Sequence, residues 1–164
     1  MSYHPTSLHS EIAPNLFMGG TDDADVIQNP IARNIRRTDM PFDAIVTMYA
    51  WAQPADWNIQ EFRYGVPDAA IADIDLNRLK QAVEFGYNRW MAGDRVLVRC
   101  QAGLNRSGLV TALILMSTGL DAETAIKEIR KNRSEDALFN QDYVTWLMKE
   151  GAAFIAPSPS AQAA

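Results

Sequence analysis

Val-Leu-Val-Arg-Cys-Gln-Ala-Gly-Leu-Asn-Arg-Ser-Gly, residues 96–108, is the stretch from which most of the fold and chemistry can be predicted. Its first residues are hydrophobic and predict a short buried strand, and the apolar run after Ser107 predicts a buried helix. Between them a loop holds Cys100, the only cysteine of the chain, and Arg106. A strand, a glycine-containing loop and a helix in this order are typical of an α/β protein that binds its ligand at the carboxyl end of a strand.

The loop has the residue types that a nucleophilic cysteine requires. A helix N-terminus and a loop that curls over it offer unpaired amide groups, which form a cradle for a tetrahedral anion. These amides and the Arg106 guanidinium can stabilise a thiolate, and the guanidinium can hold two phosphate oxygens at once. Ser107 can cap the helix or donate a hydrogen bond to the sulfur. Gly103 allows a positive φ, and Asn105 tolerates the left-handed region better than most residues.

Residues 99–108 resemble the signature loop of the cysteine-dependent protein tyrosine phosphatases of the dual-specificity branch, which usually reads His-Cys-x-x-Gly-x-x-Arg-Ser/Thr. The resemblance extends over roughly residues 12–147. It implies a metal-independent, cofactor-free phosphomonoester hydrolase that forms a cysteinyl-phosphate and acts on phosphotyrosine and also on phosphoserine or phosphothreonine. It further implies a catalytic set of Cys100, Arg106, Ser107 and an acid, and phosphate ligands from Gln101, Ala102, Gly103, Leu104, Asn105 and Arg106.

One residue departs from the family pattern. Arg99 stands where the family has a histidine that braces the loop and helps to set the thiolate. An arginine here either adds positive charge near the sulfur or points elsewhere. The departure keeps a second interpretation open, a module that binds phosphate groups or phosphopeptides but turns them over poorly. A third is a phosphatase of a non-protein phosphate, but the loop has no lysine or histidine that would add charge for a polyphosphorylated ligand.

Asp68 is the predicted general acid, because phosphoryl transfer to cysteine is accelerated when the leaving oxygen is protonated. It follows Pro67 after a strand predicted over residues 61–66, and its separation from Cys100 is similar to that between acid and cysteine in small dual-specificity phosphatases. Asp73 and Asp75 are the alternatives. We expect either of them to cap the helix that begins near Leu76.

Length and composition limit the remaining possibilities. The 164 residues predict one domain over residues 1–155, followed by a flexible tail rich in proline, serine and alanine over residues 156–164. A net charge of −5 argues against nucleic acid or an anionic membrane as the main partner. One cysteine excludes an internal disulfide and suits a reducing cytoplasm. We see neither a signal peptide nor an apolar run of about 20 residues. These features predict a monomeric, cytoplasmic protein whose partner is a phosphorylated protein or peptide.

The order of the predicted elements favours an α/β fold, with a mainly parallel central sheet flanked by helices on both faces. Strands are predicted at 12–18 (interrupted at Pro14-Asn15), 42–48, 61–66 and 95–98, and helices at 22–28, 76–91, 107–117, 121–132 and 137–150. Phe139, Tyr143, Trp146 and Leu147 are expected on the inner face of the last helix. Residues 31–40 are expected to be a solvated loop or short helix, and 51–59 an irregular connection.

Outside the cysteine loop the sequence offers few candidates. His4 and His9 have no partners at metal-ligand spacing, so we expect them on the surface without a metal. The glycine motifs of nucleotide-binding proteins do not occur. Trp51 and Trp57 are candidate cleft residues, because the connection that carries them can border the cleft.

Overall fold

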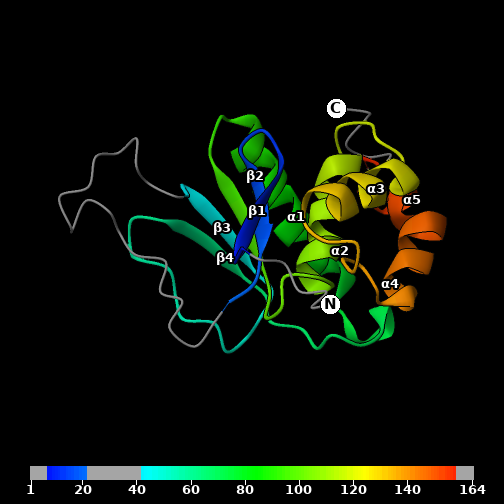
Figure 1. Cartoon of the computed structure of the whole chain (residues 1–164), viewed down its shortest axis with the longest axis horizontal. Coiled ribbons are helices and arrows are strands. Elements are labelled where there is room, and N and C mark those ends of the chain that lie inside the picture. The colour runs from blue at the N-terminus through cyan, green and yellow to red at the C-terminus, as the bar shows by residue number, and fades with distance from the viewer. Residues whose placement is uncertain (1–6, 22–41, 158–164) are drawn as a thin grey trace.

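The computed structural model describes residues 7–21 and 42–157, in which a five-stranded sheet has the order β1-β2-β5-β3-β4. The pair β1–β2 is antiparallel and the other three pairs are parallel. These elements confirm the α/β class and the mainly parallel sheet (Figure 1). The strands are β1 His9–Ala13, β2 Leu16–Gly19, β3 Ala44–Thr47, β4 Gln60–Arg63 and β5 Val96–Arg99.

Strand β5 occupies the centre of the sheet because its side chains are suited to burial on both faces. Val96, Leu97 and Val98 are fully buried, as expected for a strand with parallel neighbours on either side. All three parallel pairs run in the same direction, so β2, β3, β4 and β5 end at one edge of the sheet. This carboxyl edge is where β5 leads into the cysteine loop.

The helices follow the predicted periodicity closely up to residue 132. Asp75 caps α1, since its carboxylate accepts hydrogen bonds from the amides of Asn77 and Arg78, and Asp121 caps α3 through the amide of Thr124. The predicted helices at 76–91, 107–117 and 121–132 are therefore confirmed. The helices are α1 Leu76–Met91, α2 Arg106–Met116, α3 Ala122–Asn132, α4 Gln141–Trp146 and α5 Ala152–Ile155, with a 3₁₀ turn at Ile71–Asp73 and a π-helical turn at Leu147–Gly151.

The two faces of the sheet carry cores of different size. Val46 and Val98 belong to the larger core, which also contains the buried side chains of α1, α2 and α3. Ile45 and Leu97 point to the other face and form a smaller cluster with Phe42 and Ile59. The described helices gather on one side of the sheet in Figure 1. Among the described residues, the predicted helices on both faces are therefore found on one face only. The helix predicted at 22–28 and the segment 31–40 lie outside the described residues.

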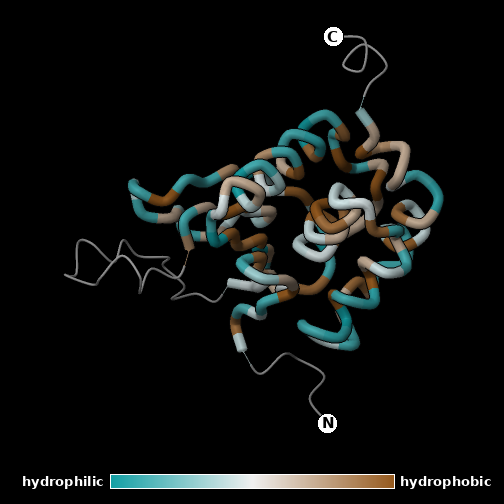
Figure 2. Tube along the Cα trace, turned by 90° about the horizontal axis from the view of Figure 1, so that it is seen from above, coloured by the Kyte–Doolittle hydropathy of each residue, from teal (hydrophilic) through white to brown (hydrophobic). Residues whose placement is uncertain are grey.

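Figure 2 shows hydrophilic segments mostly at the periphery of the chain trace and hydrophobic segments inside. Helix α2 is buried over its whole length, as its apolar sequence predicts. No helix in the described ranges is long and apolar enough to cross a membrane.

The N-terminal prediction was wrong in its connectivity. Residues 12–18 were expected to form one interrupted edge strand, but the chain reverses at Pro14-Asn15 and forms the β1–β2 hairpin. Asn15 has φ 67°, a left-handed conformation that asparagine tolerates, and its amide donates to Glu11 Oε2. The interruption is therefore a hairpin turn.

The last predicted helix begins later than expected. Leu138 has φ 59°, which no helix residue adopts, so the helix starts after Asn140 and continues through the π turn to Ile155. Tyr143 and Leu147 are buried as predicted, and Trp146 packs partly buried against the core. Phe139 is 59% exposed, which contradicts its predicted inward position. Of the predicted tail, residues 158–164 lie outside the described residues.

Candidate active site

Cys100 lies at the carboxyl end of β5, in the loop that leads into α2. Its side chain is 2% exposed, and its Sγ lies 3.2 Å from the hydroxyl of the fully buried Ser107, to which the thiol donates a hydrogen bond. When the sulfur is ionised, the hydroxyl can donate to it instead. The contact expected between the serine and the sulfur is thus present in the structure.

The loop carbonyls turn away from the loop centre and bond to the surrounding protein. The carbonyl oxygen of Gln101 accepts from the amide of Thr21 at 2.9 Å, and that of Leu104 accepts from the amide of Leu138 at 3.0 Å. Between them, the carbonyls of Ala102 and Gly103 accept from a guanidinium.

The orientation of these carbonyls determines that of the loop amides. A trans peptide unit points its C=O and N–H in opposite directions, so the amides of residues 102–105 point back toward the loop centre. Within the described part of the chain, these amides have no protein acceptor. Successive unpaired amides that converge in this way form an anion-binding concavity.

Arg133, at the end of α3, supplies the guanidinium that holds the loop from outside. Its Nε donates to Gly103 O at 3.0 Å, and its Nη1 donates to Ser7 O and Ser10 Oγ on the N-terminal segment. Burial lowers the pKa of Arg133 and the nearby Cys100 raises it. Arg133 was missed at the sequence level, because nothing in a helix-terminal arginine shows which distant carbonyls it will bind.

Gly103 is the one loop position that only glycine fits. Its φ is 73°, as predicted, and a Cβ there would lie 2.4 Å from the backbone carbon of Gly19. The loop therefore packs directly on the backbone at the end of β2. Asn105 does not follow its prediction: it has φ −97° and ψ −63°, in the right-handed region, and it acts through its side chain.

Arg106 is held between two elements at the edge of the loop. Its Nη1 donates to Val66 O at 2.9 Å, and its guanidinium carbon lies 5.4 Å from the centre of the Tyr49 ring. The side chain is 8% exposed, and its buried Nε has no acceptor within the described residues. A buried donor without an acceptor requires an explanation, and an anion in the adjacent loop would supply one.

Asp68 is tied to the loop by two asparagines. Asn105 donates to one carboxylate oxygen at 2.8 Å, and Asn140 donates to the other at 2.9 Å and also to Ala69 O. Asn105 Oδ1 in turn accepts from the amide of Asn140 at 2.9 Å. These hydrogen bonds bring together the loop that carries Asp68, the cysteine loop and the start of α4.

The two alternative acids occupy different positions. The Asp75 carboxylate is engaged as the cap of α1, and Asp73 lies in the 3₁₀ turn. Of the three aspartates, only Asp68 makes hydrogen bonds to the cysteine loop. Asn140, which completes this arrangement, was missed because it lies 72 residues from Asp68 in sequence; its cap position at α4 was its only local signal.

Arg99 points away from the sulfur. It shares a face of the sheet with Thr47 and Leu97, whereas Cys100 packs in the core on the other face. Its side chain is fully buried and donates to Thr47 Oγ1 at 3.0 Å, to Glu61 Oε2 at 3.1 Å and to Gln53 O at 2.6 Å. The residue that replaces the family histidine therefore organises the β3–β4 connection beneath the loop.

His9 is not the surface residue that was expected. It packs edge-on against Phe42, with ring centres 5.2 Å apart, and its pKa is lowered to about 4 by burial first and then by Arg133 and Arg99. No group of three or more histidine, cysteine, aspartate or glutamate side chains among residues 7–21 and 42–157 is placed to hold a metal ion.

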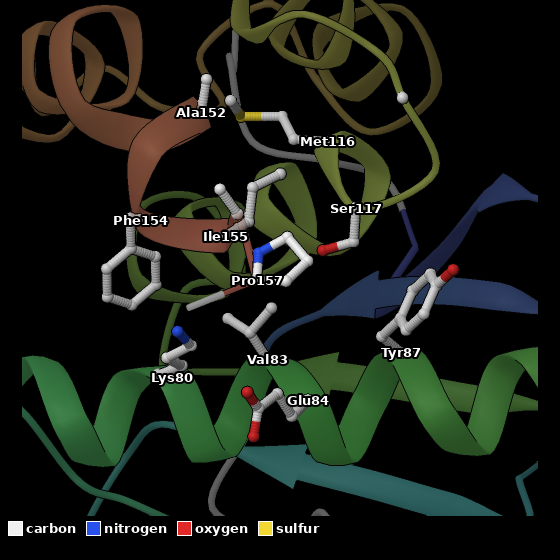
Figure 3. A pocket seen from close by; sticks show the side chains of 12 residues that line it. Lys80, Val83, Glu84, Tyr87, Met116, Ser117, Ala152, Phe154, Ile155 and Pro157 are labelled. Carbon is white, nitrogen blue, oxygen red and sulfur yellow. The ribbon is translucent and has the colours of Figure 1, made fainter. Parts of the chain in front are cut away.

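A cavity of about 390 Å³ lies elsewhere, between α1, the end of α2 and α5 (Figure 3). Val83, Met116 and Ile155 contribute apolar lining, and none of the loop residues takes part. Met116 is ten residues beyond Arg106 on the same helix, which corresponds to about 15 Å at 1.5 Å per residue. The cavity is thus separate from the cysteine loop.

Comparison with protein families gives a match that covers most of the chain. Residues 37–152 match the family described as "Dual specificity phosphatase, catalytic domain". The chain belongs to this family. A curated relative of this chain is the protein named "Putative tyrosine phosphatase 123R" of Invertebrate iridescent virus 6. It is 27% identical over 126 residues, which cover 76% of this chain and 80% of the viral protein. Membership supports phosphatase activity of the cysteine-based type on a phosphorylated substrate.

Solved structures of other proteins show the same fold as this chain. Human DUSP28 has a TM-score of 0.73 and 24% identity, with 94% of this chain and all of that one covered. The human tyrosine phosphatase-like serine/threonine/tyrosine-interacting protein has a TM-score of 0.70 and 20% identity, with 90% and 98% covered. Because the second is described as phosphatase-like and interacting, the fold alone does not decide between catalysis and binding.

Proposed function

We propose that this protein is a metal-independent phosphatase that hydrolyses phosphotyrosine, and also phosphoserine or phosphothreonine, through a cysteinyl-phosphate. The observation that carries the proposal is the loop around Cys100. Its carbonyls bond outward and its amides point inward. Among residues 7–21 and 42–157, neither these amides nor the Nε of Arg106 at the edge of the loop has a protein acceptor. Such a site matches the three non-bridging oxygens of a phosphoryl group.

In the first step the Cys100 thiolate attacks phosphorus in line with the leaving oxygen. The S–P bond forms as the P–O bond to the substrate breaks, and the leaving oxygen takes a proton from Asp68. Amides from Gln101 to Arg106 and the Arg106 fork bind the equatorial oxygens, where charge is spread in the transition state. Asn105 supports this assignment because it holds the acid against the loop at 2.8 Å.

In the second step water hydrolyses the cysteinyl-phosphate. Asp68, now a carboxylate, accepts a proton from the attacking water, and the S–P bond breaks to release inorganic phosphate. The Ser107 hydroxyl, 3.2 Å from the sulfur, donates to the departing thiolate. The enzyme returns to its starting protonation state, with one water consumed for each phosphate released.

We place this activity in a monomer that acts in a reducing compartment, the cytoplasm. The nucleophile is the only cysteine of the chain, so a disulfide within the chain cannot protect it from further oxidation. The substrate is a phosphorylated protein or peptide, consistent with a loop that adds no lysine or histidine for a second phosphate.

The first experiment measures hydrolysis of p-nitrophenyl phosphate with EDTA present, for the wild type and Cys100→Ser. We expect turnover in the wild type and background rates in the variant. With alkyl phosphates, Asp68→Asn should lose about 100- to 10,000-fold in rate, the usual range for general acid catalysis, and less with the better aryl leaving group.

Three outcomes would contradict the proposal. Activity retained in Cys100→Ser would exclude the cysteinyl-phosphate. Absence of turnover together with binding of vanadate or a phosphotyrosine peptide would identify a phosphate-binding module instead. Turnover that requires an added metal would overturn metal independence.

A further inference from the structure

The turn that follows β3 carries a large exposed apolar side chain, and the first residue of that turn contacts Arg106 at the end of the cysteine loop. The amide of Ala52 donates to Tyr49 O at 3.2 Å and closes this turn, with Trp51 at its third position. The indole of Trp51 is 83% exposed. The first residue of the same turn, Tyr49, stacks against Arg106, the proposed phosphate ligand.

The turn is anchored by side chains from the sheet. Arg63 Nη2 donates to Ala52 O at 2.7 Å and to Ala50 O at 3.4 Å. Arg99 holds the next carbonyl along, that of Gln53, at 2.6 Å. Arg63 and Arg99 both bind Glu61, so the turn and the strand that carries the nucleophile share one ion-pair network. A tryptophan on such an anchored turn loses little conformational entropy when it binds a ligand.

Exposure alone would not distinguish Trp51, since isolated exposed apolar residues are common. Trp57 lies in the same connection and is 90% exposed, but it precedes Gln60, which pairs with Ala44 at the opposite, amino edge of the parallel sheet. Position therefore separates the two tryptophans. Trp51 borders the edge that holds Cys100, and Trp57 borders the edge farthest from it.

We propose that Trp51 is a specificity-determining residue that contacts a large apolar side chain flanking the phosphorylated residue of a peptide substrate. This inference rests on the proposed function. Trp51 is two residues from Tyr49, so their Cα atoms are at most about 7.6 Å apart, since consecutive Cα atoms lie 3.8 Å apart. An extended peptide covers that distance in two or three residues, so the contacted side chain lies within a few positions of the phosphorylated one.

The charges around the site favour a peptide over a polyanionic headgroup. Arg99, Arg106 and Arg133 are each at most 8% exposed, and Arg99 is paired with Glu61. The exposed carboxylate beside the loop is Asp68. One phosphate is accommodated, whereas a second phosphate next to it would meet an acid and an indole. An apolar flanking side chain suits the indole, because burying two aromatic or aliphatic faces is favourable without charge.

The test compares two phosphotyrosine peptides that differ only at the residues flanking phosphotyrosine, leucine in one and serine in the other. We expect Trp51→Ala to raise KM about tenfold for the leucine peptide, with kcat unchanged. The serine peptide and p-nitrophenyl phosphate should change less than twofold. Trp51→Phe should recover most of the affinity, and Trp57→Ala serves as the matched control with wild-type values on all three substrates.

The outcomes separate this inference from the proposed function. An equal effect of Trp51→Ala on both peptides, or the same effect from Trp57→Ala, would overturn the role of Trp51. If the wild type hydrolysed none of the substrates, the proposed function would fail. Fluorescence anisotropy with the same two peptides would then decide on Trp51: a preference for the leucine peptide that Trp51→Ala abolishes supports it, and no such preference refutes it.

Discussion

Replacing Arg99 by methionine gives a direct measure of what this residue contributes. The guanidinium is fully buried and donates hydrogen bonds to Thr47, Gln53 and Glu61. Removal of one partner from a buried ion pair usually costs about 3–5 kcal/mol, because the other charge is left uncompensated. Here Glu61 keeps Arg63 at 3.2 Å, which places the expected loss at the lower end, about 3 kcal/mol.

The loss is large enough for simple assays. For a domain of this size, a change of 1 kcal/mol shifts Tm by about 2–4 °C, so Arg99→Met should melt roughly 6–12 °C below the wild type. Urea denaturation followed by tryptophan fluorescence should show a lower midpoint with an unchanged m value. Arg89→Met is a matched control, because it removes the partly exposed pair with Asp94, a class of pair that contributes under about 1 kcal/mol.

A double-mutant cycle tests whether the loss comes from the ion pair. Glu61→Gln alone and together with Arg99→Met should show a coupling energy above about 1 kcal/mol, because the two side chains are in contact. Strict additivity, or a cost of Arg99→Met no greater than that of Arg89→Met, would refute the reasoning. Arg99 faces away from Cys100. The kcat of Arg99→Met, measured where the variant is folded, should therefore stay close to the wild-type value even though its free energy of unfolding is lower.

Three further predictions concern single residues. Gly103→Ala should lower the free energy of unfolding by about 2–5 kcal/mol, because the position has a left-handed φ and a Cβ there would clash with backbone atoms. Gly93 also has a positive φ, 95°, but a Cβ there would meet nothing within 4 Å. Gly93→Ala should therefore lower the free energy of unfolding less in the same urea assay. Asn105→Ala should lower kcat about tenfold on poor leaving groups, since its hydrogen bond to Asp68, the proposed general acid, is worth about 1–1.5 kcal/mol. Replacement of the exposed Asn77 by alanine should leave kcat unchanged, and equal rates for both variants would contradict a role of Asn105 in holding Asp68. The pKa of His9 is about 4 in the folded protein, against the ordinary histidine value of 6.5. The unfolded chain therefore binds more protons between these two pH values, and the free energy of unfolding falls as the pH is lowered from 6.5 to 4. His9 accounts for up to about 3 kcal/mol of this loss in the free energy of unfolding. In His9→Asn, the urea midpoint should therefore depend less on pH between 4 and 6.5 than in the wild type. The same dependence of the midpoint on pH in both proteins would show that His9 is not the group responsible.

Much of the fold was predictable because its signals are local. The apolar run into Cys100 and the run after Ser107 each specify their element within a few residues, and Asp75 and Asp121 mark their helix starts by capping. The chain reversal at Asn15 and the late start of α4 were missed. In both places a non-glycine residue adopts positive φ, which sequence patterns indicate only weakly.

In the candidate site, too, the residues with local sequence signals were predicted and those without them were missed. Cys100, Arg106 and Ser107 fall within eight consecutive residues, so their proximity follows from the strand–loop–helix order. Arg133 and Asn140 lie outside this stretch, on elements that only packing brings to the loop. No local pattern shows which carbonyl or carboxylate such a side chain will meet.

The sequence by itself therefore determined the candidate nucleophile, the proposed phosphate loop and the α/β order, because each depends on neighbours along the chain. Only the tertiary structure decided which way Arg99 faces and which aspartate the loop holds. It also decided which of two exposed tryptophans borders the site. Those questions depend on strand register and on hydrogen bonds between residues tens of positions apart. The free energy of such contacts depends on where the elements pack, and this is absent from any short stretch of sequence.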